Sequence, residues 1–299
     1  MPGPAIGPCD TALRAARNAE CVLCHAGIAG EQEASLHAAS FTDASFQRGY
    51  VLEPVAFCRG CHAPEADPAV APEGFARTHG VACVTCHDPE GRGAILATRA
   101  SGRAPHAVAP VADLGTRACV ACHEFAFPGS ATHGATSMMQ RTAMEHAGVT
   151  TACATCHMPP DEDGHPGHRF GASRDAGLLA RSVVVETTRL DGERVSFALT
   201  ARGVGHAFPT GDLFRRLVLR VTSARGTVIE EPFGRSFRAR DGVREEIRDR
   251  RLAPRQSVTL AARAGATWQL VYQRVTSVDQ TPPFASHVES ETELARGAL

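Results

Sequence analysis

The chain contains no lysine and almost no asparagine. All 31 of its basic residues are arginines, and Asn18 is the single asparagine. We attribute this bias to the codon usage of a GC-rich genome. No stretch approaches the run of about 18 apolar residues that a membrane-spanning helix needs, so we expect no segment to cross a bilayer. Residues 1–8 have neither the basic nor the apolar part of an export signal. We therefore expect either a mature form of the protein or a gene model that starts too late.

Cysteine, in contrast, is abundant and regularly placed. Ten of the 11 cysteines belong to five copies of the pattern Cys-x-x-Cys-His, all within the first 157 residues. Successive copies begin 37, 25, 36 and 34 residues apart, a spacing too irregular for a solenoid repeat. In chain order the copies, called motifs 1 to 5 below, are Cys21/Cys24/His25, Cys58/Cys61/His62, Cys83/Cys86/His87, Cys119/Cys122/His123 and Cys153/Cys156/His157.

This pattern is the attachment signature of c-type haem. The two thiols form thioethers with the porphyrin vinyl groups, and the histidine reaches the iron. Zinc is the alternative, because Cys-x-x-Cys knuckles also form tetrahedral sites. Zinc takes four ligands from two knuckles, so five knuckles cannot pair evenly, and it does not require a histidine after every second cysteine. The sequence therefore predicts five covalently bound haem c groups, and leaves Cys9 as a free thiol, a lipid attachment point or an intermolecular contact.

Haem attachment also bears on location and charge. Bacteria attach haem to this pattern after export, so we expect the protein to be periplasmic or extracellular. Residues 1–180 carry 12 arginines against 18 acidic residues, whereas residues 181–299 carry 19 against 14. The haem propionates would make the first part more negative still.

Sequence texture divides the chain at the same place, and it predicts an α+β fold class. Residues 1–180 are rich in Ala, Gly and Pro, which suits a haem-packed domain of short helices and loops; we expect helices at Thr11–Cys24, Glu31–Ala39 and Thr136–Ala147. Residues 181–299 contain short β-branched runs separated by turn signals, which predicts a β-sandwich-like domain. The expected strands are Val183–Thr188, Val195–Thr200, Leu217–Thr222, Thr227–Glu230, Val258–Ala262 and Trp268–Val275. The charge run Ile247–Arg255 is expected to be solvated surface, with docking of a partner as the alternative.

An electron-transfer haem usually has a second axial ligand, His or Met, that closes the iron to other molecules. The histidines outside the five motifs outnumber the five ligands needed; they are His37, His79, His106, His133, His146, His165, His168, His206 and His287. Met138 and Met139 could supply one thioether ligand, although a helical methionine pair more often packs in a core.

Segments around the motifs resemble the multihaem c-type cytochromes, a group that includes the tetrahaem electron acceptor of hydroxylamine oxidoreductase. These segments are Ser35-Leu36-His37, His79-Gly80-Val81, Ala104-Pro105-His106, Met139-Gln140 through Glu145, His168-Arg169-Phe170 and Gly205 through Asp212. The resemblance implies closely stacked haems with two histidine ligands each, and an appended C-terminal β module whose loop histidine points back to the haem domain.

On this basis we assign five histidines as distal ligands: His37, His79, His106, His168 and His206. His133 and His146 are the reserves, and His165 and His287 are expected to be ordinary surface residues.

Closed low-spin irons pass electrons without binding substrate, so the leading expectation is an electron-transfer protein with redox protein partners. A multihaem oxidoreductase with one open haem, acting on a nitrogen or sulfur oxyanion, is the first alternative. The absence of lysine excludes a lysine-ligated haem, and only Tyr50 and Tyr272 could form a tyrosine crosslink. A subunit of a polymeric cytochrome wire or respiratory complex is the second alternative. We expect no nucleic-acid partner; peripheral or lipid anchoring and a homo-oligomer or filament stay open.

Overall fold

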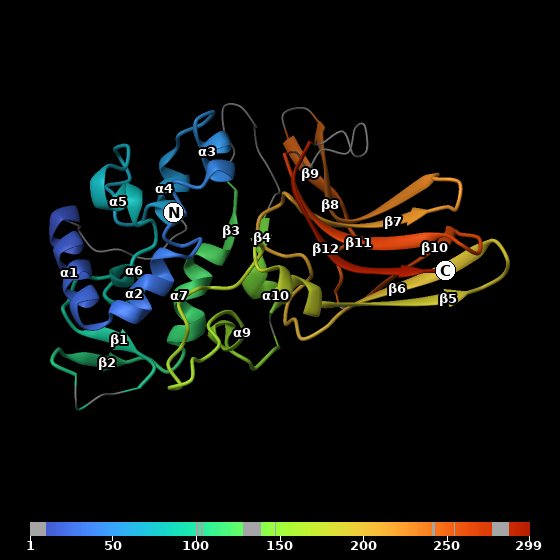
Figure 1. Ribbon diagram of the computed structural model, residues 1–299. Helices are drawn as coiled ribbons and strands as arrows, with labels where there is room; N and C mark the ends of the chain where they lie inside the picture. Colours follow the sequence, from blue (N-terminus) through green and yellow to red (C-terminus); the bar gives the residue numbers. More distant parts are fainter. Residues whose placement is uncertain are drawn as a thin grey trace. The chain divides into compact units, whose positions relative to one another are not determined.

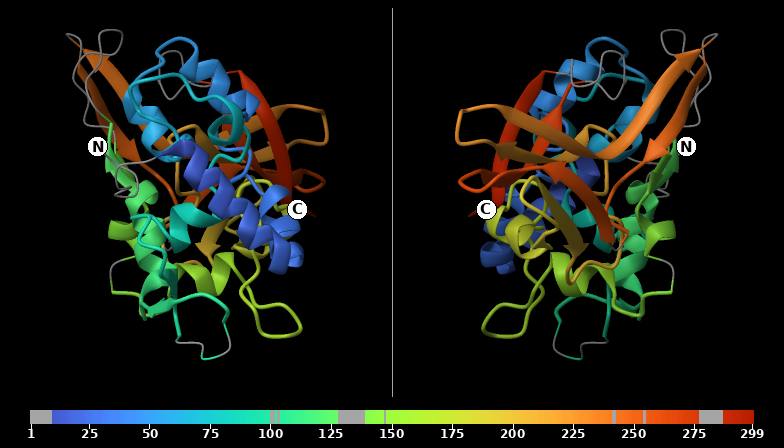
Figure 2. Two further views of the ribbon diagram at one scale, coloured as in Figure 1. Left: turned by 90° about the vertical axis from the view of Figure 1, so that its left-hand side faces the viewer. Right: turned by 90° about the vertical axis from the view of Figure 1, so that its right-hand side faces the viewer.

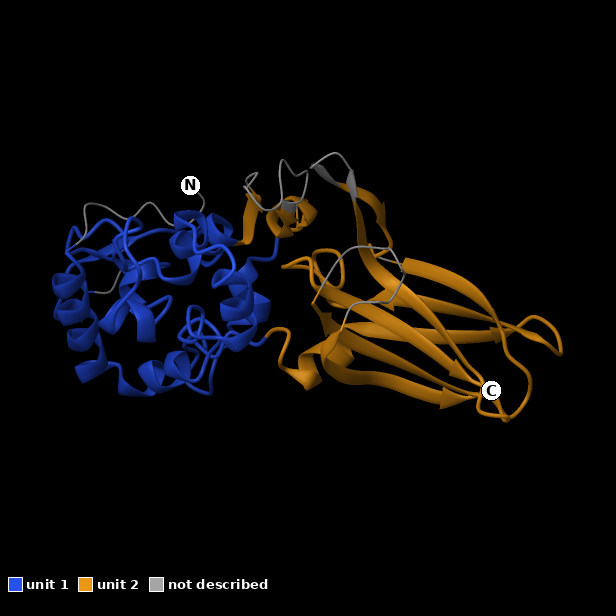
Figure 3. Ribbon diagram, turned by 90° about the horizontal axis from the view of Figure 1, so that it is seen from above, with its two compact units in different colours: residues 1–122, 150–171 blue, residues 123–149, 172–299 orange. Residues whose placement is uncertain are grey.

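A computed structural model describes residues 10–99, 102, 104–127, 139–146, 148–240, 243–253, 255–276 and 287–299. Cys9, His133 and Met138 lie outside the described residues. The chain forms two compact units (Figure 3). Unit 1 comprises residues 1–122 and 150–171, and unit 2 comprises residues 123–149 and 172–299.

Unit 1 consists of short helices joined by irregular loops (Figures 1 and 2). The helices are α1 (Thr11–Cys24), α2 (Ala26–Glu33), α3 (Ala44–Tyr50), α4 (Ala56–His62), α5 (Gly74–Thr78), α6 (Cys83–His87), α7 (Leu114–His123), whose last residue belongs to unit 2, and α9 (Cys153–His157). A parallel pair, β1 (Ile95–Ala97) and β2 (Val108–Pro110), completes it. The apolar cluster described in this unit is small, with Phe41, Tyr50 and Ala63 as its buried members.

Local sequence explains where two of these helices begin or end. The expected helix Thr11–Cys24 is confirmed, and the Asp10 carboxylate caps it by accepting hydrogen bonds from two backbone N–H groups. The expected helix Glu31–Ala39 is wrong, because α2 ends at Glu33. The Ser35 hydroxyl donates to the Gln32 carbonyl and accepts from backbone N–H groups that follow it, which favours a turn over a helix.

Unit 2 is mainly β-structure. Its elements are β3 (Glu124–Ala126), β4 (Met139–Arg141), α8 (Thr142–Glu145), α10 (Ala176–Arg181), β5 (Val183–Arg189), β6 (Arg194–Ala201), β7 (Arg215–Thr222), β8 (Val228–Arg240), β9 (Val243–Asp249), β10 (Arg255–Ala261), β11 (Thr267–Val275) and β12 (Val288–Ala298). Strands β10-β6-β5 form one antiparallel sheet, β12-β11-β7-β8-β9 form a second, and β3 pairs with β4. The mixed α+β composition predicted from the sequence is confirmed.

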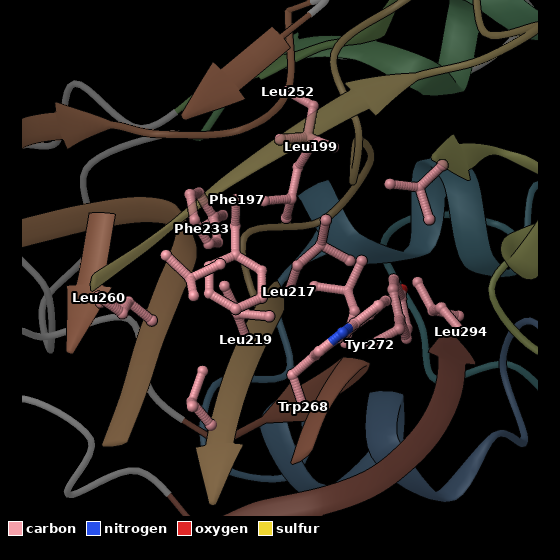
Figure 4. Close-up of a cluster of buried hydrophobic side chains, with 14 of the residues drawn as sticks. Phe197, Leu199, Leu217, Leu219, Phe233, Leu252, Leu260, Trp268, Tyr272 and Leu294 are labelled. Atoms are coloured by element: carbon pink, nitrogen blue, oxygen red, sulfur yellow. The ribbon is translucent and has the colours of Figure 1, made fainter. Parts of the chain in front are cut away.

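The two larger sheets share one apolar core (Figure 4). Val195, Phe197 and Leu199 alternate along β6 and are almost fully buried, and they meet Leu217 and Leu219 of β7. Because successive side chains of a strand point to opposite faces, this alternation directs one face of each sheet into the core. Each of the six β runs expected from the sequence overlaps a strand.

Two further expectations for this unit are wrong. The described part of Thr136–Ala147 is strand β4 followed by the single-turn helix α8, not one helix. The run Ile247–Arg255 is not uniformly solvated, because the side chain of Leu252 is fully buried and that of Arg251 nearly so. Arg251 is neutralised in place by the carboxylates of Asp249 and Glu145.

Candidate haem-attachment sites

All five Cys-x-x-Cys-His motifs adopt the same local structure. Each occupies the last helical turn of its element: motif 1 ends α1, with His25 as the C-cap, and the other four end α4, α6, α7 and α9 at the histidine itself. In a helix, residues three and four positions apart lie on one face. Both thiols and the imidazole of each motif therefore project from the same face of a turn, as attachment to a single porphyrin requires.

The ten described cysteines are free thiols, and several of them meet across motifs. The thiol of Cys21 hydrogen-bonds to that of Cys83, and Cys61 pairs in the same way with Cys122. Motif 1 thus adjoins motif 3, and motif 2 adjoins motif 4.

The ten thiols differ in their exposure to solvent. Cys24 and Cys156 are exposed, whereas the other eight are partly buried. Both exposed thiols lie in the last turn of their helices, α1 and α9. Helix α9 has only five residues, none of them buried. A porphyrin linked to Cys156 would itself have to cover this thiol.

Burial changes the pKa of one thiol in unit 1. Together with the charge of Glu65, it raises the pKa of Cys86 to about 11. A raised pKa keeps this thiol protonated at pH 7.

Three motif histidines have the ring nitrogen Nδ1 held by a backbone carbonyl. The Nδ1 atom lies 2.7 Å from the Ser40 oxygen in His62, 2.7 Å from the Leu96 oxygen in His87, and 2.9 Å from the Gly171 oxygen in His157. A carbonyl can only accept, so Nδ1 carries the proton and Nε2 is the nitrogen that would bind a metal. Such carbonyl contacts are typical partners of metal-binding histidines.

The remaining two motif histidines differ in their surroundings. In His123, Nδ1 lies 3.2 Å from the side-chain amide of Gln140, within unit 2. His25 is exposed at the end of α1. Gln140 and His123 are 17 residues apart in the sequence, and the pairing of β3 with β4 brings them together.

Two of the assigned distal histidines gather with motif histidines in unit 1. His37 contacts the Phe170 ring edge-on, with ring centroids 4.3 Å apart, and His168 contacts the same ring at 5.6 Å. The His87 and His168 rings are 6.3 Å apart. Burial, followed by the nearby charges of His157 and His168, lowers the pKa of His37 to about 4, so this imidazole is neutral at pH 7 and able to act as a ligand.

The His168 segment is fixed to helix α2. Its backbone N–H donates to the Glu31 carboxylate at 2.8 Å, and its Nδ1 lies 2.8 Å from the Pro166 carbonyl oxygen. Arg169 also pairs with Glu31. Burial lowers the pKa of His168, which keeps this ring neutral as well.

His79 and His106, the other candidates in unit 1, stand elsewhere. His79 caps the C-terminus of α5, with Nδ1 3.0 Å from the Thr78 hydroxyl and its ring 4.5 Å from that of Phe75. His106 is exposed, and its charge contributes to lowering the pKa of the Cys21 thiol in motif 1. Neither residue belongs to the group formed by His37, His87, His168 and Phe170, which is called the Phe170 cluster below.

In unit 2, His206 follows a loop glycine that has a second histidine packed against it. Nδ1 of His206 lies 3.0 Å from the Ala207 carbonyl oxygen. Nδ1 of His146 lies 3.1 Å from the Gly205 carbonyl oxygen, and a Cβ at Gly205 would overlap the His146 ring. The structure therefore brings the reserve candidate His146 to the loop that carries His206, a placement that sequence reasoning missed because 59 residues separate the contacting pair.

Charged side chains hold the His146 segment in place. Glu145 accepts hydrogen bonds from the Thr210 hydroxyl at 2.8 Å and from the Arg251 guanidinium at 2.5 Å. Arg141 pairs with Asp249 at 2.9 Å. These contacts fix α8 to the loop after His206 and to the end of β9.

Other candidates take no part in these groups. His165 is exposed beside Asp161, as expected for a surface residue, and His287 is also exposed. For Met139 only the backbone, in β4, is described. Within the described ranges, no group of three or more His, Cys, Asp or Glu side chains is arranged to hold a bare metal ion. In the same ranges no helix is long and apolar enough to cross a membrane.

Comparison with known proteins gives one informative match. No protein-family model and no curated protein matches the sequence. A penta-heme cytochrome c552 from Thermochromatium tepidum matches in structure, with a TM-score of 0.67 and 20% sequence identity, over 93% of this chain and 97% of that one. A bromine derivative of BhCBM56 matches over 40% of this chain with a TM-score of 0.19 and 6% identity, a similarity too weak to indicate a shared fold. At 20% identity the first match shows that the two chains share a fold.

Proposed function

We propose that the protein is a multihaem c-type cytochrome that transfers electrons through five covalently bound haems. The observation that carries the proposal is the shared geometry of the five motifs, each presenting two thiols and an imidazole on one face of a helical turn. The fold shared with a penta-heme cytochrome c552 supports it. When bound, the haem iron supplies the change of one electron between its ferric and ferrous states.

The chain's own residues would then hold, orient and shield each porphyrin. The ten motif cysteines, the exposed Cys156 included, would form the thioethers, and the five motif histidines would bind iron through Nε2. As distal ligands we propose His37, His79, His106, His168 and His206. Support is strongest for His37 and His168, because both lie in the Phe170 cluster with motif histidines and are kept neutral by burial.

We propose the domain organisation that the sequence suggests, with a haem domain in residues 1–180 and a β domain in residues 181–299. The β domain would contribute His206 from its loop. In support, Gly205 and the contacts of Glu145 fix this loop within unit 2, so the imidazole would lose little conformational entropy on binding iron. A ligand of this kind would clamp the β domain to the haem domain.

Haem attachment also supports an exported protein, periplasmic or extracellular, that exchanges electrons with redox protein partners. Oxidised haems with two propionates would leave residues 1–180 strongly acidic, which favours partners with a basic docking surface.

The experiment is a spectroscopic comparison of holoprotein variants. His206→Ala should convert one of five haems from low to high spin in the paramagnetic resonance spectrum, and should speed proteolysis of the C-terminal half. His165→Ala is the matched control, because that histidine is exposed and expected to bind nothing.

Carbon monoxide provides an independent readout on the unaltered protein. It should barely change the reduced spectrum if every iron has two histidine ligands. Stoichiometric binding at one haem would favour an oxidoreductase instead. An unchanged low-spin spectrum in His206→Ala with five haems retained would overturn the assignment of His206 and return His133 and His146 to the set of candidates.

A further inference from the structure

Motif 2 contains a buried arginine whose hydrogen-bond partners among the described residues are all neutral. Arg59 lies between the two cysteines of this motif, and its side chain and backbone together are 8% exposed. Its Nε donates to the Pro68 carbonyl at 3.0 Å, and one terminal nitrogen donates to the Tyr50 hydroxyl and to the Pro54 carbonyl, each at 2.9 Å. The other terminal nitrogen also donates to the Pro68 carbonyl. A guanidinium stays protonated in proteins, so a fixed positive charge is held in this interior.

Motif 3 has the opposite arrangement. Arg14 is equally buried, but it forms a two-point ion pair with the fully buried Glu65. Asp88, which follows the motif histidine directly, pairs with Arg17. Of the described residues of unit 1, Arg14 and Arg59 are the buried arginines, and Arg14 alone of these two has a carboxylate partner. The buried arginine beside motif 3 is therefore neutralised by direct contact with a carboxylate, whereas the hydrogen-bond partners described for the buried arginine of motif 2 carry no charge.

The surroundings of motif 2 leave little water to screen this charge. Tyr50 packs with Phe41 and Phe46, and the Phe46 ring stacks on that of His62 with centroids 3.8 Å apart. Burial raises the pKa of Cys58, with a further contribution from the charge of Glu53, which is partly exposed. A charge in such an apolar setting acts at a higher effective strength than one in water.

We propose that Arg59 raises the reduction potential of the haem attached at motif 2 above that of the haem attached at motif 3. The inference rests on the proposed function. Ferric haem carries one more positive charge than ferrous haem, so a buried cation favours the reduced state. For an effective dielectric constant of about 20 and a separation of about 10 Å, one unit charge changes the equilibrium constant for reduction on the order of tenfold. A tenfold change corresponds to about 59 mV for one electron.

The test is a potentiometric titration of holoprotein, with paramagnetic NMR assigning each midpoint to its haem. Arg59→Gln should lower the equilibrium constant for reduction of the motif 2 haem about tenfold, which lowers its midpoint potential by about 59 mV. The midpoint potentials of the other four haems should change less. Arg77→Gln is the matched control: it removes the same charge from the same unit, at an exposed arginine that lies over the Phe41 ring at 5.7 Å. It should leave all five midpoints in place.

Two results separate this inference from the proposed function. Five haems by mass, all low spin, with the motif 2 midpoint unmoved in Arg59→Gln would overturn the role of Arg59 and leave the proposed function standing. Fewer haems, or high-spin iron, in the unaltered protein would contradict the proposed function itself. Should Arg59→Gln not fold, the unaltered protein decides, because the motif 2 haem must then titrate above the motif 3 haem, and the reverse order overturns the inference.

Discussion

Gly80→Ala should destabilise the protein through one close approach of two backbone segments in unit 1. Gly80 has a φ of +51°, and a Cβ there would overlap the Ser40 hydroxyl and the carbonyl oxygen of His37, and lie 2.7 Å from that of Ala38. The positive φ costs an alanine about 1 kcal/mol. Backbone oxygens cannot turn aside as a flexible side chain can, so the overlap should cost about 2 kcal/mol more.

The displaced segment also supports two histidines of the candidate sites. The Val81 N–H donates to the His37 carbonyl, and the Ser40 carbonyl accepts from Nδ1 of His62. Gly80→Ala should therefore change the low-spin signal of at least one haem besides lowering the free energy of unfolding.

Gly74→Ala is a control with the same backbone strain and no overlap. Its φ is +48°, and no atom lies within 4 Å of the position that an added Cβ would take. It should cost about 1 kcal/mol, against about 3 kcal/mol for Gly80→Ala. Guanidinium unfolding of the two holoproteins, followed by circular dichroism, measures the difference. Equal losses in the two variants would refute the close approach.

Two further predictions concern the β-sheet unit. Phe197→Ala removes a fully buried ring from the core between the sheets, and should lower the free energy of unfolding by about 3–5 kcal/mol in the same assay; a loss below about 1 kcal/mol would contradict the shared core. Burial raises the pKa of Asp212, but the guanidinia of Arg215 and Arg274 outweigh burial and lower that pKa from 3.8 to about 2. A lowered folded-state pKa stabilises the protein above about pH 4 and loses that contribution, about 2 kcal/mol, as the pH falls toward about 2. Unfolding measured against pH should show this loss in the unaltered protein, and Asp212→Asn should be less stable at pH 7 and lack the acid-dependent step.

The sequence was a good guide wherever the signal is local. The attachment motifs need only five consecutive residues, and the strands β6 and β7 carry buried apolar side chains at every second position, at Val195, Phe197 and Leu199 and at Leu217, Leu219 and Val221. Helix α1 follows from its capping residue Asp10. Each of these features depends on neighbours within a turn or a strand, which is the range that sequence patterns describe.

Features that depend on distant partners escaped prediction. The segment 139–145 has helical composition, yet β4 pairs with the distant strand β3 and this pairing overrides the local preference. Arg251 stands in a charge run expected to be solvated, and is buried because Glu145 neutralises it. The placement of His146 against Gly205 likewise arises from a contact between segments 59 residues apart.

The central claim is that five haems are covalently attached within residues 21–157, and the mass of the intact, denatured holoprotein tests it most directly. Denaturation removes any cofactor that is held only by contacts, whereas thioether-linked haem stays on the chain. The account predicts a mass greater than that of the polypeptide by five haems. A fully matured protein that carries four or fewer would contradict it.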